Sequence, residues 1–157
     1  MALHEYCIPD AVLCNLEAGD KEDALRQLVD ALAAAKAFPK TKTSAICKEV
    51  IERERRATTG IGGGIGIPHA RSAHAKKVSI AIGRIDGGID FGAVDGERVG
   101  VILLMVSPKD SPDDHLAAMK AIVLMVRDPY QCKRLHGCRT PESFMGLIAE
   151  IDAMAGS

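Results

Sequence analysis

The pattern of apolar and polar residues in the first third of the chain predicts one extended segment followed by a helix. Residues 8–18 mix apolar and polar positions around a proline, which suits a short extended segment. Asp20 is a good helix N-cap, and apolar residues then recur at helical spacing with charges on the opposite face. Phe38-Pro39 ends this helix. Its apolar positions are Ala24, Leu25, Leu28, Val29 and Leu32.

A second helix is predicted from about Thr43 to Arg56, and it places a charge close to its apolar face. Ile46, Val50 and Arg53 are spaced so that they lie near one side of the helix. Two interpretations of Arg53 are open. Its stem packs while its head reaches water, or its guanidinium points at an anion beside the segment that follows.

The middle of the chain has the pattern of a sheet. Residues 78–85 alternate well enough for a strand, and Asp-Gly-Gly at 86–88 predicts a turn before a short strand over 89–94. Another turn is predicted at 95–97. Residues 99–106 form a near-continuous apolar run, which is expected of a strand that is buried on both faces.

Three more helices are predicted after this buried strand. Ser111 suits an N-cap and Pro112 the first helical position, with an apolar stripe behind them. A short helix over 130–136 and a last one over 141–154, capped by Thr140, complete the chain. Because helices precede and follow the strands, the pattern predicts an α/β fold with helices on both faces of the sheet.

Composition limits the class of protein. The chain has 157 residues, and we expect one domain over 1–157; with 47% hydrophobic and only 3% aromatic residues, its core must be aliphatic. A net charge of −1 argues against a general nucleic-acid binder. No apolar run approaches the roughly 20 residues that cross a bilayer, and no signal peptide is recognisable, so we expect no membrane insertion.

The cysteines indicate neither disulfides nor a zinc ribbon. Their number is five, which is odd, and no Cys-x-x-Cys pair occurs. Reduced thiols in a cytoplasmic protein are the simplest interpretation.

The most unusual segment runs from Thr58 to Arg71. Its glycines lead through Ile67-Pro68 to His69, so a permissive backbone ends in a stiffly held imidazole. Glycine amides can approach a ligand closely, although a glycine-rich loop that merely crosses another element explains the pattern equally well. No Gly-Lys-Ser/Thr follows and no G-x-G-x-x-G register fits, which excludes a P-loop and a dinucleotide fingerprint. The glycines are Gly60, Gly62, Gly63, Gly64 and Gly66.

His115 is a second candidate, in the opening turn of a predicted helix just after the buried strand. Backbone amides and the helix dipole favour an anion there, and the carboxylates of Asp113 and Asp114 should favour a protonated imidazole. The alternative is a surface histidine near a helix cap.

Other chemistry has less support in the sequence. A metal site drawn from His69, His74 and His115 lacks a Cys, Asp or Glu at ligand spacing. A Cys–His nucleophile pair remains open, although no cysteine sits on a distinctive turn. We expect His4, His74 and His136 to be solvated surface groups.

Taken together, the motifs resemble the enzyme IIA domain of the fructose–mannitol class of the bacterial phosphoenolpyruvate phosphotransferase system, including its nitrogen-regulatory branch. The resemblance covers nearly the whole chain. It is carried by Arg53-Glu54, Thr58-Thr59-Gly60-Ile61-Gly62, Ile65-Gly66-Ile67-Pro68-His69 and Asp114-His115-Leu116.

This resemblance implies a three-layer α/β/α sandwich with a central mixed β-sheet and no cofactor or metal. His69 would be the nucleophile phosphorylated by HPr or an HPr-like carrier, and a IIB component or a regulatory target would be the downstream partner. His115 and Arg53 would stabilise the phosphoryl group. Supporting roles would fall to Thr58, Thr59, Gly60, Gly62 and Pro68, with a threonine oxygen orienting the His69 ring and glycine amides contacting the phosphoryl oxygens.

Two departures from the family pattern bear on the expected role. Gly66 stands where the family usually has alanine, which should loosen the backbone before His69. No IIB or IIC segment is recognisable beside this domain, which favours a regulatory switch protein that binds a transporter, sensor kinase or other regulator according to its phosphorylation state. A third alternative is a domain of this fold that binds anions or partners without turnover.

Overall fold

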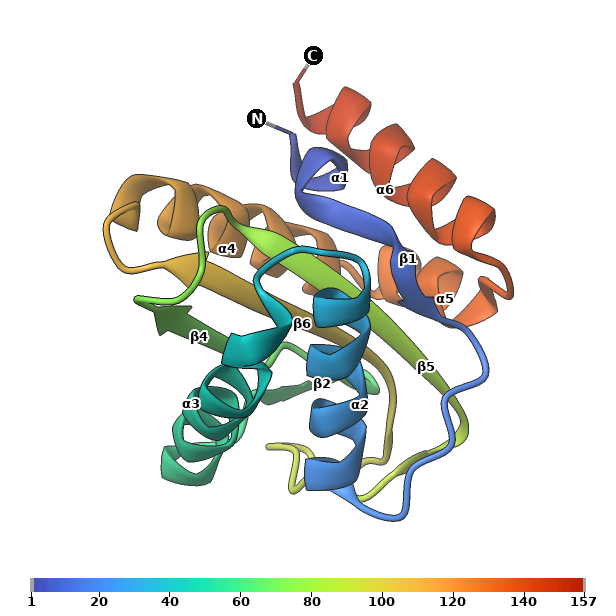
Figure 1. Cartoon of the computed structure of the whole chain (residues 1–157). Coiled ribbons are helices and arrows are strands. Elements are labelled where there is room, and N and C mark those ends of the chain that lie inside the picture. The colour runs from blue at the N-terminus through green and yellow to red at the C-terminus, as the bar shows by residue number, and fades with distance from the viewer. Residues whose placement is uncertain (1, 157) are drawn as a thin grey trace.

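The computed structural model describes residues 2–156 and shows one mixed β-sheet between two layers of helices (Figure 1). Within those residues the strands are β1 (Cys7–Leu13), β2 (Gly60–Gly62), β3 (Ile65–Gly66), β4 (His69–Ser72), β5 (Ser79–Ile89) and β6 (Val99–Pro108). The helices are α1 (Leu3–Tyr6), α2 (Lys21–Ala34), α3 (Thr43–Arg56), α4 (Pro112–Val126), α5 (Pro129–Gly137) and α6 (Pro141–Ala155), with a 3-10 turn η1 (Lys40–Lys42) before α3.

Strand β6 organises the sheet. On one side it pairs antiparallel with β5, which in turn pairs parallel with β1. On its other side β3 and β4 follow one another, both parallel to β6. The register sets Gly66 opposite Ile102 and His69 opposite Met105, so Ile67-Pro68 is the break between two short strands along one edge of β6.

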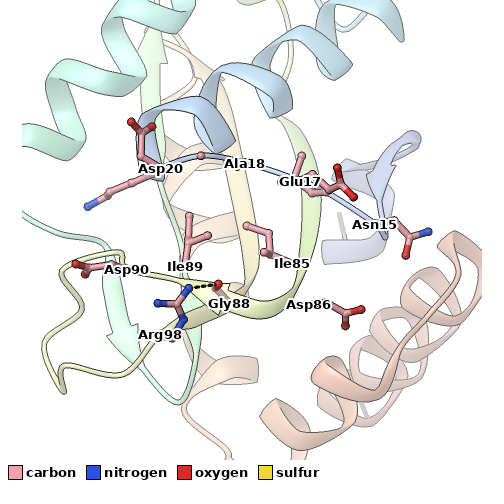
Figure 2. A pocket seen from close by; sticks show the side chains of 13 residues that line it. Asn15, Glu17, Ala18, Asp20, Ile85, Asp86, Gly88, Ile89, Asp90 and Arg98 are labelled. Atoms are coloured by element: carbon pink, nitrogen blue, oxygen red, sulfur yellow. Dashed lines mark hydrogen bonds between the residues drawn. The ribbon is translucent and has the colours of Figure 1, made fainter.

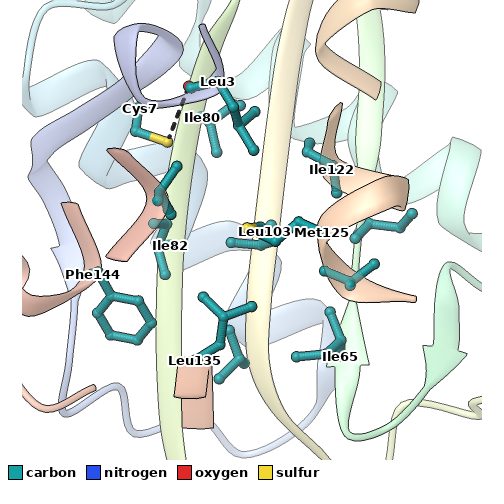
Figure 3. Packing of buried hydrophobic residues seen from close by; sticks show 14 of the residues in the cluster. Leu3, Cys7, Ile65, Ile80, Ile82, Leu103, Ile122, Met125, Leu135 and Phe144 are labelled. Carbon is teal, nitrogen blue, oxygen red and sulfur yellow. Dashed lines mark hydrogen bonds between the residues drawn. The ribbon is translucent and has the colours of Figure 1, made fainter. Parts of the chain in front are cut away.

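Two apolar clusters fill the two sides of the sheet. One lies under α1, α4, α5 and α6, and Figure 3 shows Ile82, Leu103 and Ile122 meeting there. The other lies under α2 and α3. Successive β6 residues alternate between them, since Met105 belongs to the first and Val106 to the second. The prediction of a strand buried on both faces is confirmed, as is the three-layer fold.

The predicted starts of α2 and α6 agree with the structure, and side chains cap both. Helix α3 has its predicted bounds without a side-chain cap, whereas α2 ends at Ala34, before the predicted end at Phe38-Pro39. Asp20 accepts a hydrogen bond from the Asp23 amide at 2.8 Å, and Thr140 accepts one from the Ser143 amide at 3.1 Å. Ser111 occupies the N-cap of α4 but accepts no capping hydrogen bond with its side chain. Helix α1, a single turn, was not predicted, because four residues are too few for a visible period.

The predicted turn at 86–88 and strand over 89–94 are wrong. Strand β5 runs on to Ile89 through a register shift after Arg84. Gly87 and Gly88 take φ of +73° and +68°, which lets the strand bend instead of turning back. The guanidinium of Arg98 donates to both glycine carbonyls, at 2.9 and 2.7 Å, and holds the bend.

The glycine-rich segment forms a small antiparallel hairpin of β2 and β3. Gly62, Gly63 and Gly64 have positive φ at its turn. Gly66, by contrast, has an ordinary strand conformation and lies under Phe91, whose ring is 1% exposed. The structure thus gives Gly66 a packing role, because the Phe91 side chain fills the space that an alanine methyl group would take.

We predict that Gly66→Ala destabilises the fold. A Cβ at this position would lie 2.9 Å from Cζ of Phe91, so the buried ring must move. Overpacking of this kind costs about 1–3 kcal/mol of unfolding free energy, measurable by denaturant titration. Gly146→Ala in α6 is the control, since its added Cβ meets nothing within 4 Å and should stabilise by about 0.5–1 kcal/mol. Unchanged stability of Gly66→Ala would contradict this packing argument.

Candidate active site

The sheet register brings two histidines together. His69 opens β4 and lies beside Met105 near the end of β6. The chain leaves β6 at Pro108 and enters α4, whose first turn carries His115. The two imidazole ring centroids are 5.8 Å apart, with the ring planes inclined at 54°. Residues 46 positions apart in the sequence thus share one site because β4 pairs with the last part of β6.

Both rings open into a cavity of about 370 Å³. Arg53 lies at this cavity, as the sequence suggested, and its Nη1 donates to the carbonyl of Ala57 at 3.1 Å. The other lining residues are Glu49, Glu52, Arg56, Ala70, Arg71 and Lys109. Four cationic side chains and two carboxylates therefore surround the histidines, which makes the cavity suitable for an anion.

Sequence reasoning missed three of these cations. Arg71 had a usable signal, because it stands two residues after His69 and side chains at that spacing share one side of a strand. Arg56 and Lys109 are exposed and lie outside any motif. Only the fold brings them to the cavity.

The structure fixes which nitrogen of His69 is free. Nδ1 lies 2.9 Å from the carbonyl oxygen of Ile67. Because a carbonyl can only accept, Nδ1 carries the proton and Nε2 carries the lone pair. The nucleophilic nitrogen of the neutral ring is thus Nε2. The expectation that a threonine oxygen orients this ring is wrong.

Thr59 supports the His69 ring indirectly, through the backbone of Ile67. The Ile67 amide donates to the carbonyl of Thr59 at 3.0 Å. The backbone amide and hydroxyl of Thr59 both donate to the carboxylate of Glu54, at 2.8 and 2.6 Å. That buried carboxylate is paired with Lys21 at 2.6 Å. Glu54 was part of the recognised motif but had no assigned role, and it anchors the segment that carries His69.

Thr58 has a separate task. Its hydroxyl donates to the carbonyl of Phe91 at 3.3 Å and accepts from the Gly60 amide at 3.0 Å. It therefore ties the start of the hairpin to the segment that contains Phe91, away from the His69 ring.

The His115 ring is held by a side-chain hydroxyl. Its Nδ1 lies 2.8 Å from Oγ of Ser107, a residue of β6 with no exposed surface. The His115 side chain is itself buried, at 8% exposure. A hydroxyl can either donate or accept, so this contact suits both charge states of the ring.

Burial lowers the pKa of both histidines. For His69, desolvation is the main cause and outweighs the hydrogen bond to the Ile67 carbonyl, which raises the pKa. The Arg53 charge lowers the pKa further, and Glu54 raises it slightly. For His115, desolvation again dominates, and His69 and Arg71 lower the pKa further. The prediction that Asp113 and Asp114 keep His115 protonated is therefore wrong, since both carboxylates are exposed and the ring is buried.

This electrostatic environment predicts a specific pH dependence. In an NMR titration, both imidazoles should titrate below the ordinary value of about 6.5. Because the unfolded state then binds protons before the folded state does, unfolding free energy is fully retained above about pH 6.5 and falls as the pH drops towards the folded-state pKa values. A pKa of His69 at or above 6.5 would contradict the desolvation argument.

Comparison with known proteins decides the family. Residues 5–151 match the sequence profile of the phosphoenolpyruvate-dependent sugar phosphotransferase system EIIA 2 family. The chain belongs to this family. It is therefore a phosphotransferase-system component, and its relatives agree with a role as a phosphoryl carrier or a regulator.

Relatives of this EIIA-2 domain come from two branches. A nitrogen regulatory protein of Bradyrhizobium diazoefficiens is 30% identical over 151 residues, covering 95% of each chain. The nitrogen regulatory protein IIA-Ntr of Neisseria meningitidis has the same fold, with a TM-score of 0.84, 20% identity and coverage of 93% and 98%. Enzyme IIA of the mannitol system of Escherichia coli, solved in complex with phosphorylated enzyme IIB, gives a TM-score of 0.74 at 15% identity, covering 90% and 95%.

The glycine hairpin of this EIIA-2 domain lies away from the histidine cavity. Gly62 and Gly63 line a different hollow of about 880 Å³, together with Ile61 and the facing ends of α4 and α5. None of the glycines lines the cavity at His69, so their amides do not form a cradle there. His136 of α5 bonds the Gly63 carbonyl through Nε2 at 2.8 Å.

Two of the three histidines expected on the surface have structural partners. His136 holds the hairpin, and His4 bonds Asp152 of α6 through Nδ1 at 2.6 Å. His74 is half-buried, and its backbone amide donates to the hydroxyl of Ser72. His4 and His136 are thus partly exposed, as expected of surface groups, but each also links two parts of the fold.

A third hollow of about 710 Å³ lies at the start of α2 (Figure 2). Glu17, Asp86, Asp90 and Arg98 are among its lining residues, which include no histidine or cysteine.

Each of the five cysteines is buried and unpaired, and burial raises the pKa of Cys7 to about 12. In residues 2–156 no three His, Cys, Asp or Glu side chains are placed to hold a metal ion, and no helix is long and apolar enough to cross a membrane.

Proposed function

We propose that His69 accepts a phosphoryl group from the phosphohistidine of HPr or an HPr-like carrier and then passes it on. The observation that carries this proposal is the pair of imidazoles 5.8 Å apart, with Nε2 of His69 free of its proton at a cationic cavity. The roles that the resemblance implies for His69 and His115 thus agree with the positions of the two rings at this cavity.

In the proposed step, the lone pair on Nε2 of His69 attacks phosphorus in line with the donor nitrogen. The new N–P bond forms as the donor's N–P bond breaks, and that electron pair returns to the donor imidazole. Nδ1–H of His69 stays bonded to the Ile67 carbonyl throughout. Such a transfer depends mainly on positioning and on charge stabilisation.

The protein supplies the groups that meet the phosphoryl oxygens. His115 offers a buried N–H donor, and Arg53 stands at the edge of the same cavity. Arg71 and Lys109 add positive charge on the side of β4 and the end of β6. Preorganised donors and cations of this kind stabilise the transition state without reorganisation during the step.

The surface at the histidine cavity combines charged and apolar side chains. The cavity itself is lined by charged side chains, while Leu116, next to His115, is 65% exposed. We propose that a carrier docks on the surface around the cavity, including Leu116, with its histidine directed into the cavity.

Two roles are consistent with the same chemistry. As a carrier, the domain hands the group to a IIB component, the kind of partner with which the mannitol enzyme IIA was solved. As a switch, it binds a transporter, sensor kinase or other regulator according to its phosphorylation state. The similarity to nitrogen regulatory proteins over nearly the whole chain favours the switch. We further propose that the chain acts in the cytoplasm as a single phosphotransferase domain.

Reconstitution tests the proposal. The protein is incubated with phosphoenolpyruvate, enzyme I and a bacterial HPr, and its intact mass is followed with time. One added phosphoryl group that requires all three components supports the proposal, whereas an unchanged mass with active HPr would overturn it.

A second experiment separates carrier from switch. The phosphorylated protein is mixed with a IIB domain, and both forms are used in parallel to capture regulators from a lysate of the source organism. Rapid discharge onto IIB favours the carrier. Slow discharge together with capture of one identified regulator by a single form favours the switch.

A further inference from the structure

The two active-site imidazoles have chemically different partners on Nδ1. At His69 the partner is a carbonyl oxygen, that of Ile67, at 2.9 Å. At His115 the partner is a hydroxyl, that of Ser107, at 2.8 Å. A carbonyl can only accept a hydrogen bond, whereas a hydroxyl can also donate one. The two rings can therefore be held in opposite tautomers.

Opposite tautomers are what the proposed chemistry requires. The nucleophile needs a lone pair on Nε2, which the carbonyl partner of His69 ensures. The stabilising ring needs a proton on Nε2 while it is neutral, so its Nδ1 must accept. Burial lowers the pKa of His115 and keeps the free ring neutral at pH 7, which makes its tautomer decisive.

The place of Ser107 in β6 fits this role. Met105 points into the cluster under α4 and Val106 into the cluster under α2 and α3, so alternation returns Ser107 to the side of α4. Its side chain has no exposed surface, so solvent does not compete for the hydroxyl.

We infer that Ser107 is a positioning residue, whose hydroxyl donates to Nδ1 of His115 and so keeps the proton on Nε2, facing the phosphoryl group on His69. This inference rests on the proposed function. When His115 becomes charged next to the phosphoryl group, Nδ1 gains a proton and the same hydroxyl turns to accept it. The contact thus persists in both charge states of His115, whereas a carbonyl in the same place would hold the neutral ring in the opposite tautomer.

The first test reads the tautomers directly in the unphosphorylated protein. Long-range ¹H–¹⁵N correlation spectra should show His69 protonated on Nδ1 and His115 protonated on Nε2, with Nδ1 of His115 shifted as a hydrogen-bonded acceptor. In Ser107→Ala that acceptor signal should move to the position of an unbonded imine nitrogen or disappear into a mixture of tautomers. A wild-type His115 that carries its proton on Nδ1 would overturn the inference without any variant.

The second test measures transfer to and from HPr. Ser107→Ala should slow it by about fivefold or more, the effect of losing one buried hydrogen bond, and Ser107→Thr should restore most of the rate by restoring the hydroxyl. Ser79→Ala is the matched control. Ser79 lies on β5, opposite Val106 of β6. Its buried hydroxyl has no hydrogen-bond partner among the described residues, so the variant removes a buried serine hydroxyl without breaking a hydrogen bond.

The outcomes separate the two proposals. A wild-type protein that never accepts a phosphoryl group refutes the proposed function, whatever the tautomers are. A wild-type protein that accepts it, with Ser107→Ala as fast as Ser79→Ala and the same His115 spectrum in both, refutes the role of Ser107 alone.

Discussion

His69→Ala is expected to abolish phosphorylation completely. The reaction has no acceptor atom without Nε2 of this ring, and the cations around the cavity stabilise the transfer but do not replace the acceptor. In the reconstituted system the wild-type mass should rise by one phosphoryl group, while the mass of the variant stays unchanged over the same period.

Two further variants make the His69 result specific. His69→Gln keeps a polar side chain of similar length but no imidazole, and it should fail as completely as His69→Ala. His74→Ala removes a half-buried histidine of the same region that does not line the cavity, and it should be phosphorylated at the wild-type rate. Undiminished labelling of His69→Ala would mean that another residue is the acceptor.

The second large effect is expected at His115. In His115→Ala the nucleophile is intact, so a phosphoryl group should still appear on the protein after long incubation. The rate of transfer should nevertheless fall by about 10²-fold, because the variant lacks the buried donor that we propose for the phosphoryl oxygens. Rapid-quench measurements with phosphorylated HPr, and then with a IIB domain, would follow both directions.

The control for this variant is Asp114→Asn. Asp114 neighbours His115 in the first turn of α4 but is exposed, so removing its charge should leave the transfer rate close to wild type. Rates for His115→Ala that match the wild type in both directions would remove His115 from the site.

How far the sequence predicts this molecule depends on the kind of interaction. Apolar period and capping residues located α2, α3, α4, α5 and α6, and the unbroken apolar run located β6, because these signals are local. The continuation of β5 past Asp86 escaped prediction. It depends on Arg98, which holds the carbonyls of Gly87 and Gly88 from eleven and ten residues away.

In the candidate site, too, local sequence signals were predictable and long-range contacts were not. Motif residues identified His69, His115 and Arg53, but their partners are set by the fold. Glu54 contacts the His69 segment through Thr59 and Ile67, and Ser107 contacts His115 where the chain passes from β6 into α4. The direction of the pKa shift of His115 was mispredicted, because the neighbouring carboxylates are evident in the sequence and the burial of the ring is not.

The most direct test of the central claim is to locate the phosphorus on the ring. The protein, uniformly labelled with ¹⁵N and phosphorylated through HPr, is studied by long-range ¹H–¹⁵N and ³¹P NMR. We predict a phosphorus bonded to Nε2 of His69, with the proton retained on Nδ1 against the Ile67 carbonyl. Phosphorus on Nδ1 of His69, or on any other residue, would contradict this account.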